Sequence, residues 1–154
     1  PMYYTAHEII EIAVRIEENG NAFYYAAADI LKDHTDTRGL FIDLAEKEIQ
    51  HIAVFQKLAE KLETEDFDLD QNEAAAYITH LAESHIFGKP DAGRELAKTV
   101  TSPRQALEIA FKFENDSVAF YTELEKKVKT DAKKLVKQII EEEQEHAADI
   151  KRFL

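Results

Sequence analysis

The stretch that decides the fold is EIAVRIEENGNAFY at residues 11–24, which returns as EIAFKFENDSVAFY at residues 108–121. Each copy has a glutamate at its seventh position and ends in Ala-Phe-Tyr. Further along the chain, EIQH at residues 48–51 is matched by EQEH at residues 143–146. The chain therefore contains the same helical hairpin twice, offset by 97 residues in the first pair and 95 in the second.

The composition favours a single helical domain. A chain of 154 residues is about one domain by length and can bury about two-thirds of its unfolded surface. Glycine (4) and proline (3) are scarce, which favours helix throughout. Cysteine is absent, so disulfides, thiolate metal sites and a thiol nucleophile are excluded.

The net charge and the hydropathy of the sequence limit the classes of partner that the protein can bind. The net charge of −12 and the lack of a basic stripe argue against nucleic-acid binding. No apolar run approaches the roughly 20 residues of a membrane span, and no signal peptide is visible. We therefore expect a cytoplasmic protein without a membrane or nucleic-acid partner.

Start and stop signals predict five helices. Thr5-x-x-Glu8 is a capping box, and Ser102-Pro103 joins a cap residue to proline at the first helical position. The predicted helices span about 6–32, 36–63, 72–87, 103–129 and 131–154, and the third of them is short.

The loop lengths predict an all-α four-helix bundle. The loops within residues 6–63 and within residues 102–154 are short, so the helices of each half are antiparallel neighbours. The halves are joined by a long crossover, residues 64–101, that carries the short extra helix. We expect one domain over residues 1–154 with an internal pseudo-two-fold repeat.

Polar residues interrupt the apolar stripes of the long helices. Glu48 follows Leu44 by four residues, and His51 precedes Phe55 by four. The same spacing places the remaining polar residues of the repeat on buried faces. Six residues are thus predicted to point into the bundle: Glu17, Glu48, His51, Glu114, Glu143 and His146.

Four inward carboxylates and two imidazoles are typical of a paired metal site. Uncompensated buried carboxylates cost several kcal/mol each and repel one another, whereas two divalent cations cancel four carboxylates. Carboxylate with imidazole suits iron, manganese or zinc, and Glu-x-x-His presents both groups on one helix face. The alternative is a metal-free bundle with buried polar groups.

At these six residues the chain resembles the ferritin-like di-iron carboxylate proteins, specifically the rubrerythrin branch, over nearly its whole length. The resemblance implies a ferritin-like bundle holding two irons, with manganese or zinc as possible substitutes. It implies that Glu48 and Glu143 bridge the metals, with Glu17 and Glu114 as terminal ligands. His51 and His146 would each bind one metal. It also implies a homodimer and a role in oxidative-stress defence.

Two departures from the family pattern bear on function. Rubrerythrins usually carry a cysteine-ligated rubredoxin domain, so this cysteine-free chain needs a separate electron-donor protein. They also carry an extra glutamate at the position of Ser117, whose repeat mate is Gly20. The expected function is an enzyme, a di-iron oxidoreductase reducing peroxide or dioxygen. The alternatives are an iron-binding or ferroxidase protein and a metal-stabilised structural or sensor bundle.

Several other residues allow two interpretations. Tyr24 and Tyr121 are core aromatics or hydrogen-bond donors to the ligands. His80 and His85 could form a further metal site but are more simply structural. The lysines at 126–129 suit a helix C-terminus or a negatively charged electron donor. Five glutamates that fall off the apolar stripes are assigned to solvent: Glu18, Glu46, Glu141, Glu142 and Glu145.

Overall fold

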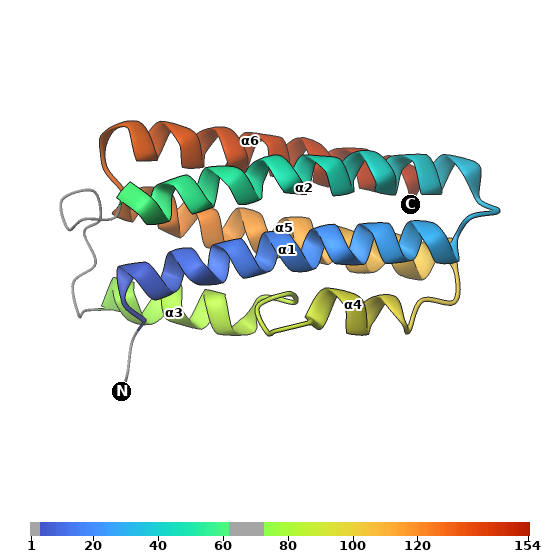
Figure 1. Cartoon of the computed structure of the whole chain (residues 1–154), viewed down its shortest axis with the longest axis horizontal. Coiled ribbons are helices and arrows are strands. Elements are labelled where there is room, and N and C mark those ends of the chain that lie inside the picture. The colour runs from blue at the N-terminus through green and yellow to red at the C-terminus, as the bar shows by residue number, and fades with distance from the viewer. Residues whose placement is uncertain (1–3, 62–72) are drawn as a thin grey trace.

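The computed structural model describes residues 4–61 and 73–154, and every regular element in these ranges is a helix. Four long helices run side by side along the long axis (Figure 1). They are α1 (Ala6–Ile30), α2 (Thr35–Lys61), α5 (Pro103–Lys127) and α6 (Thr130–Phe153). Two shorter helices, α3 (Glu73–Ser84) and α4 (Ala92–Ala97), lie between α2 and α5 in the chain. The predicted all-α bundle with one long crossover is confirmed.

The predicted helix starts have the expected caps. The Thr5 hydroxyl accepts from the Glu8 amide, and the Glu8 carboxylate accepts from the Thr5 amide. The Ser102 hydroxyl accepts from the Gln105 amide, and Pro103 opens the helix. These side chains satisfy amides that a helix leaves unpaired at its first turn, and so they fix where α1 and α5 begin.

The two hairpins pack as the loop lengths predict. α1 lies against α2, and α5 lies against α6, while the crossover places α3 against α5 and α4 against α1 (Figure 1). Within the described ranges, no helix is both long enough and apolar enough to cross a membrane.

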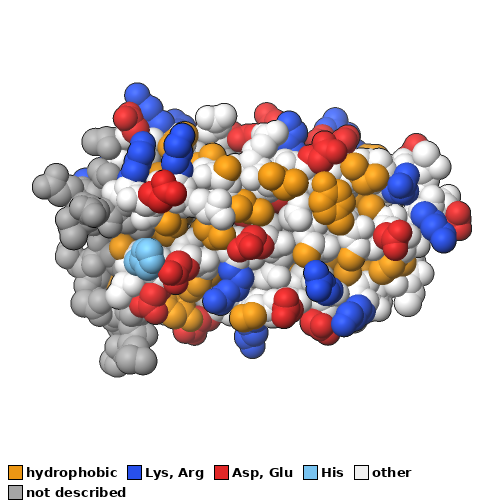
Figure 2. Space-filling view, in the orientation of Figure 1, with side chains coloured by type: hydrophobic (Ala, Val, Ile, Leu, Met, Phe, Trp, Pro, Cys, Tyr) orange, Lys and Arg blue, Asp and Glu red, His pale blue; other side chains and the backbone are white. Residues whose placement is uncertain are grey.

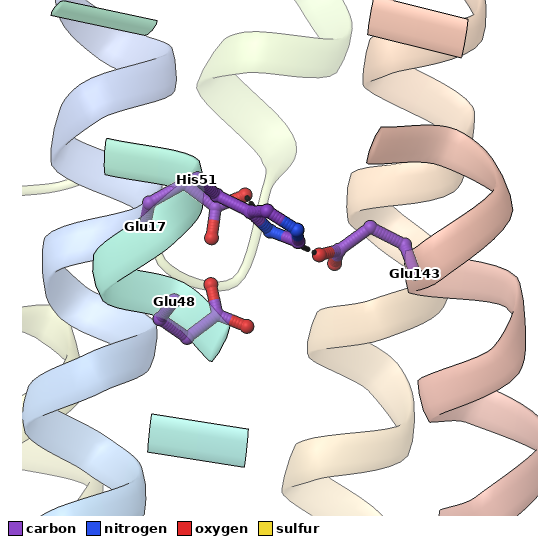
Figure 3. A group of neighbouring side chains, drawn as sticks. All are labelled: Glu17, Glu48, His51 and Glu143. Atoms are coloured by element: carbon purple, nitrogen blue, oxygen red, sulfur yellow. Dashed lines mark ion pairs between the residues drawn. The ribbon is translucent and has the colours of Figure 1, made fainter. Parts of the chain in front are cut away.

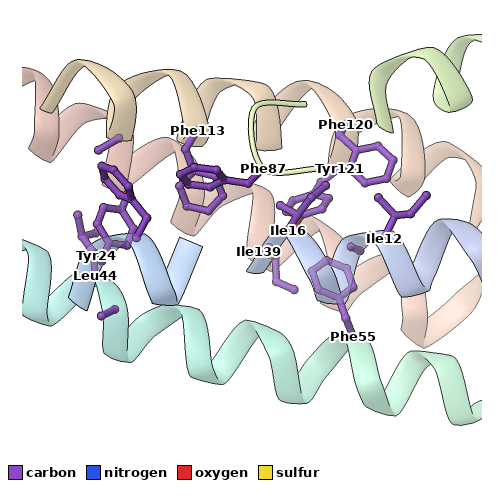
Figure 4. Packing of buried hydrophobic residues seen from close by; sticks show 14 of the residues in the cluster. Ile12, Ile16, Tyr24, Leu44, Phe55, Phe87, Phe113, Phe120, Tyr121 and Ile139 are labelled. Carbon is purple, nitrogen blue, oxygen red and sulfur yellow. The ribbon is translucent and has the colours of Figure 1, made fainter. Parts of the chain in front are cut away.

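Aromatic rings fill the core on both sides of the bundle's centre. The Phe87 ring of the crossover lies 4.8 Å from that of Phe113, which lies 5.8 Å from the Tyr24 ring. In a second group the rings of Phe55 and Tyr121 are 4.9 Å apart (Figure 4). Because these rings are fully buried, they hold the long helices at fixed separations around the polar residues between them.

The crossover differs from the prediction in two respects. The helix expected to run to Phe87 ends at Ser84, because the side chains of His85 and Phe87 both turn inward to meet α5. The helix α4 was not predicted, because its six residues are too few to show a period. The predicted end of the second helix near residue 63 and the predicted start of the third near residue 72 lie outside the described residues.

Hydrogen bonds from the side chain of Asn19 hold the crossover against α1. Its side-chain amide donates to the carbonyl oxygens of Phe87 and Lys89 at 2.7 and 2.8 Å, and its side-chain oxygen accepts from the Gly93 amide. A Cβ atom at Gly93 would overlap the carbonyl group of Asn19, so α4 can approach α1 this closely only with glycine there. The crossover is thereby held beside the centre of the bundle.

Candidate metal centre

The six residues singled out from the sequence meet in the middle of the bundle. They form two groups in which ligand atoms lie within 4.8 Å of one another. One group is Glu17, Glu48, His51 and Glu143, whose side chains converge in Figure 3. The other is Glu48, Glu114, Glu143 and His146. Glu48 and Glu143 belong to both groups, so two adjacent metal positions would share these two carboxylates.

Each long helix contributes to the site. α1 and α5 supply one glutamate each, and α2 and α6 each supply a Glu-x-x-His pair. Residues three apart lie on one helix face, so one helix presents its carboxylate and its imidazole together. The six residues thus reach the centre from all four long helices.

The site is closed to water and dense in charge. The four glutamates are fully buried, while His51 is 2 % exposed and His146 is 6 % exposed. His51 Nδ1 lies 2.9 Å from Glu143 Oε1 and 3.7 Å from Glu17 Oε1. His146 Nδ1 lies 3.7 Å from Glu114 Oε2 and 3.9 Å from Glu143 Oε1.

Two tyrosines bond crosswise to the outer glutamates. The Tyr24 hydroxyl of α1 donates to Glu114 Oε1 of α5, and the Tyr121 hydroxyl of α5 donates to Glu17 Oε1 of α1, both at 2.7 Å. Burial, followed by the charge of the neighbouring glutamate, raises the pKa of both phenols. Both tyrosines therefore stay protonated and act as hydrogen-bond donors, besides packing in the core.

The remaining polar atoms of the site have no hydrogen-bond partner. They are both oxygens of Glu48 and of Glu143, Oε2 of Glu17 and of Glu114, both nitrogens of His51, and Nδ1 of His146. Among the described residues, every buried side-chain nitrogen or oxygen without a hydrogen bond belongs to these six residues. Leaving such groups unpaired costs about 1–3 kcal/mol each, more when charged. A pair of metal ions fits this donor set, because it would satisfy the unpaired atoms and cancel the charge.

The close packing of buried charged groups shifts the pKa values of two of the glutamates. Burial, and then the charges of Glu114 and Glu17, raise the pKa of Glu143 well above its ordinary value. Burial acts against ionisation of Glu114 as well, but Glu143, His146 and Tyr24 outweigh it and lower the pKa of Glu114. The two carboxyl groups thus differ in acidity, and of this pair Glu143 is the one that holds a proton more readily.

Glu142 belongs to this neighbourhood, contrary to the prediction. It was assigned to solvent, but its carboxylate lies 3.7 Å from His51 Nε2 and its side chain is only 30 % exposed. Burial lowers the pKa of His51, but the charges of Glu17 and Glu142 outweigh burial and raise it. The repeat mate of Glu142 is Lys47, so the internal repeat gave no signal for this residue.

His85 is structural, and Ser117 is its partner. His85 Nε2 lies 2.9 Å from the Ser117 hydroxyl, and His85 Nδ1 accepts from the Phe87 amide at 2.9 Å. Because Nδ1 is an acceptor, Nε2 carries the proton and donates to Ser117. Burial, followed by the charge of Lys112, lowers the pKa of His85 to about 3, so the ring stays neutral. In the described ranges, neither His85 nor the exposed His80 joins a group that could hold a metal.

Gly20, which the repeat matches to Ser117, has different surroundings. A Cβ atom at Gly20 would overlap the ring of Phe113, so glycine leaves room for this ring of α5 against α1. Ser117 instead contacts the crossover through His85. The four glutamates and two histidines thus follow the repeat, whereas their surroundings do not.

Comparison with known proteins agrees with this arrangement. The family model described as the ferritin-like domain matches residues 5–154. No curated protein and no solved structure gives a significant match. The family match covers all four long helices and both Glu-x-x-His pairs, and the buried carboxylates and imidazoles are compatible with a di-metal site. The chain belongs to the ferritin-like domain family.

Proposed function

We propose that this protein is a di-iron oxidoreductase of the rubrerythrin type, which reduces hydrogen peroxide or dioxygen with electrons from a separate donor protein. The observation that carries the proposal is the set of buried, unpartnered atoms on Glu17, Glu48, Glu114, Glu143 and the two histidines. Such a cluster is costly in a purely structural bundle.

The free atoms suggest a role for each glutamate. The tyrosines occupy one oxygen of Glu17 and one of Glu114, which leaves each of these residues a single free oxygen for a metal. Glu48 and Glu143 have both oxygens free and lie in both ligand groups. These two can therefore bridge a metal pair, with Glu17 and Glu114 as terminal ligands, as the resemblance to rubrerythrins implies.

The protein's own contribution is binding, closure and proton storage. Two ferrous ions held here would supply two electrons, which with two protons convert one peroxide to two waters. The carboxylates neutralise the metals, and the buried walls exclude bulk water. The two tyrosines hold protons next to the ligands, and their raised pKa values keep those protons in place. Zinc would fit the same donors but cannot change oxidation state.

A lysine cluster offers a surface for the electron donor. Six of the chain's 19 basic residues lie between 126 and 137, against three acidic residues between 123 and 137, in a protein of net charge −12. Blue side chains gather at the end of the bundle where α6 begins (Figure 2). Lys133, Lys134 and Lys137 lie in the first turns of α6, where the helix dipole disfavours cations. Lys133 also donates to the carbonyl oxygen of Glu125 near the end of α5, and the cluster as a whole supports docking of an acidic donor protein. The homodimer and the cytoplasmic location remain predictions.

The proposal is tested by loading and reoxidation. Anaerobic loading with ferrous iron should give about two irons per chain, in agreement with the two ligand groups. Stopped-flow mixing with peroxide and with dioxygen should then oxidise the bound iron faster than free ferrous iron. His51→Ala should abolish both effects, and His80→Ala, an exposed histidine outside the site, should abolish neither. Oxidation no faster than that of free iron would refute the oxidoreductase function.

Ser117 favours one alternative. The position where rubrerythrins carry an extra glutamate holds a buried hydroxyl bonded to His85, which cannot act as a fifth carboxylate. The absence of this carboxylate removes support for the rubrerythrin peroxide reaction and so favours the alternative of a ferroxidase that oxidises ferrous iron without turnover of peroxide. Uptake of many more than two irons per chain during aerobic titration, with no peroxide-dependent oxidation of the donor, would establish that alternative.

A further inference from the structure

A pocket of about 380 Å³ opens on the surface between α2 and α6 and reaches the metal centre. Asp43, Glu46 and Lys47 of α2 line it on one side, and Asp149 of α6 lines it on the other. His146 is part of its wall. The pocket thus connects a rim of charged groups with one of the six candidate ligands.

The imidazole of His146 separates this pocket from the buried carboxylates. His146 is more than nine-tenths buried, and its Nδ1 has no hydrogen-bond partner. That atom lies within 3.9 Å of both Glu114 and Glu143, while the same ring lines the pocket. The other five ligands are at most 2 % exposed, so His146 is the most accessible member of the site.

The pseudo-symmetric side of the site is closed differently. There the outer nitrogen of His51 lies 3.7 Å from the carboxylate of Glu142, which covers it. The repeat mates of Asp43 and Asp149 are Gln138 and Val54, neither of which is acidic. Asp43 and Asp149 therefore have no acidic counterpart on the His51 side, where the acid nearest the imidazole, Glu142, lies against the ring itself.

We propose that this pocket is the passage through which divalent metal ions enter the buried site, with Asp43 and Glu46 attracting the cation and His146 as the inner gate. The proposal rests on the proposed metal-binding function. Asp149 contributes less, because Arg152 pairs with it. A cleft lined by charge of one sign raises the local concentration of counter-ions and their rate of entry.

The positive charge of Lys47 allows the proposed attraction of cations to be tested in the opposite direction. It is the only cationic side chain among the pocket residues named here, so it should slow the approach of a metal cation. Removing Lys47 and removing the acids should then change the entry rate in opposite directions. Because salt screens exposed charges, both effects should shrink as ionic strength rises.

The experiment follows uptake of Co²⁺ by the metal-free full-length protein, using the absorbance of the bound ion in a stopped-flow instrument. The Asp43→Asn/Glu46→Gln variant should take up Co²⁺ about tenfold more slowly than the wild type at low salt. Lys47→Gln should take it up severalfold faster. Leu40 also lines the pocket, and Leu40→Phe, which narrows it without changing its charge, should take up Co²⁺ more slowly. Glu141→Gln is the matched control, because Glu141 is the exposed repeat mate of Glu46.

The amount of Co²⁺ bound at equilibrium distinguishes a failure of the passage from a failure of the metal site. All of these variants should reach about two Co²⁺ per chain at equilibrium, because none of them changes a ligand. Equal uptake rates in the wild type and the acid and Leu40 variants, with full stoichiometry, would overturn the passage and leave the metal site intact. Slower uptake by Lys47→Gln would also overturn it. A wild-type protein that binds no stoichiometric Co²⁺ would overturn the proposed function and the passage together.

Discussion

Acidification should weaken the metal-free protein through His85. The ordinary pKa of histidine, 6.5, applies to the unfolded chain, whereas burial followed by the charge of Lys112 lowers the pKa of folded His85 to about 3. As pH falls below 6.5, the unfolded state takes up a proton that the folded state refuses, so stability is lost as pH falls. One pKa unit is worth about 1.4 kcal/mol, so the loss due to His85 between neutral pH and about pH 5 is about 2 kcal/mol.

The assay is urea unfolding followed by circular dichroism, with chelator present, at several pH values between about 7.5 and 5. Glu143 and His51, whose pKa values are raised in the folded state, contribute stability that grows as pH falls. The wild type is therefore compared with His85→Gln, in which these two groups are unchanged. The variant should be less stable at neutral pH, because the bond to Ser117 is altered, and this deficit should shrink by about 2 kcal/mol by about pH 5.

The matched control is His80→Gln, since His80 is an exposed histidine of α3. Its stability should follow the wild type within about 0.5 kcal/mol at every pH. If the wild type and His85→Gln instead lose stability in parallel, His85 is protonated in the folded protein. That result would refute the burial of this ring between the crossover and α5.

Three further outcomes are expected. Tyr24→Phe leaves Glu114 Oε1 without its donor and should lower the free energy of unfolding by about 1–3 kcal/mol in urea titrations; an unchanged value would contradict that bond. Glu143→Gln should raise the melting temperature of the metal-free protein at neutral pH, because it replaces a carboxyl group whose ionisation is disfavoured by burial and by the charges of Glu114 and Glu17, and elemental analysis should show lost metal. A lower melting temperature would contradict the crowding. Gly93→Ala should destabilise the protein by about 1–3 kcal/mol, because its Cβ overlaps Asn19; tolerance of alanine would contradict the close approach of α4 to α1.

The convergence of the six ligands was predictable because it depends only on periodicity. Glu48 and His51 fall on the stripe marked by Leu44 and Phe55, and all of these residues are buried. The second half repeats the pattern, so the sequence alone predicts that one face of each of the four long helices turns to a common centre. Short loops within each half then left few ways to arrange the helices.

What was not predictable depends on contacts between segments distant in the chain. Glu142 lies off the apolar stripe of its own helix, and only the approach of α2 brings His51 within 3.7 Å of it. The bond from His85 to Ser117 joins residues 32 positions apart, and no local pattern marks it. The same holds for α4, whose place depends on Asn19 and Gly93 rather than on helix propensity.

The two metal positions that the repeat produces are equivalent in their ligands but not in their surroundings. At one position His51 lies between two carboxylates, with Nδ1 2.9 Å from Glu143 and Nε2 3.7 Å from Glu142. At the other, His146 lines an open pocket where the mate of Glu142 is Lys47. An imidazole free on its outer side can move at less cost than one paired with a carboxylate. If the two candidate positions bind metal, exchange should therefore begin at His146 rather than beside His51.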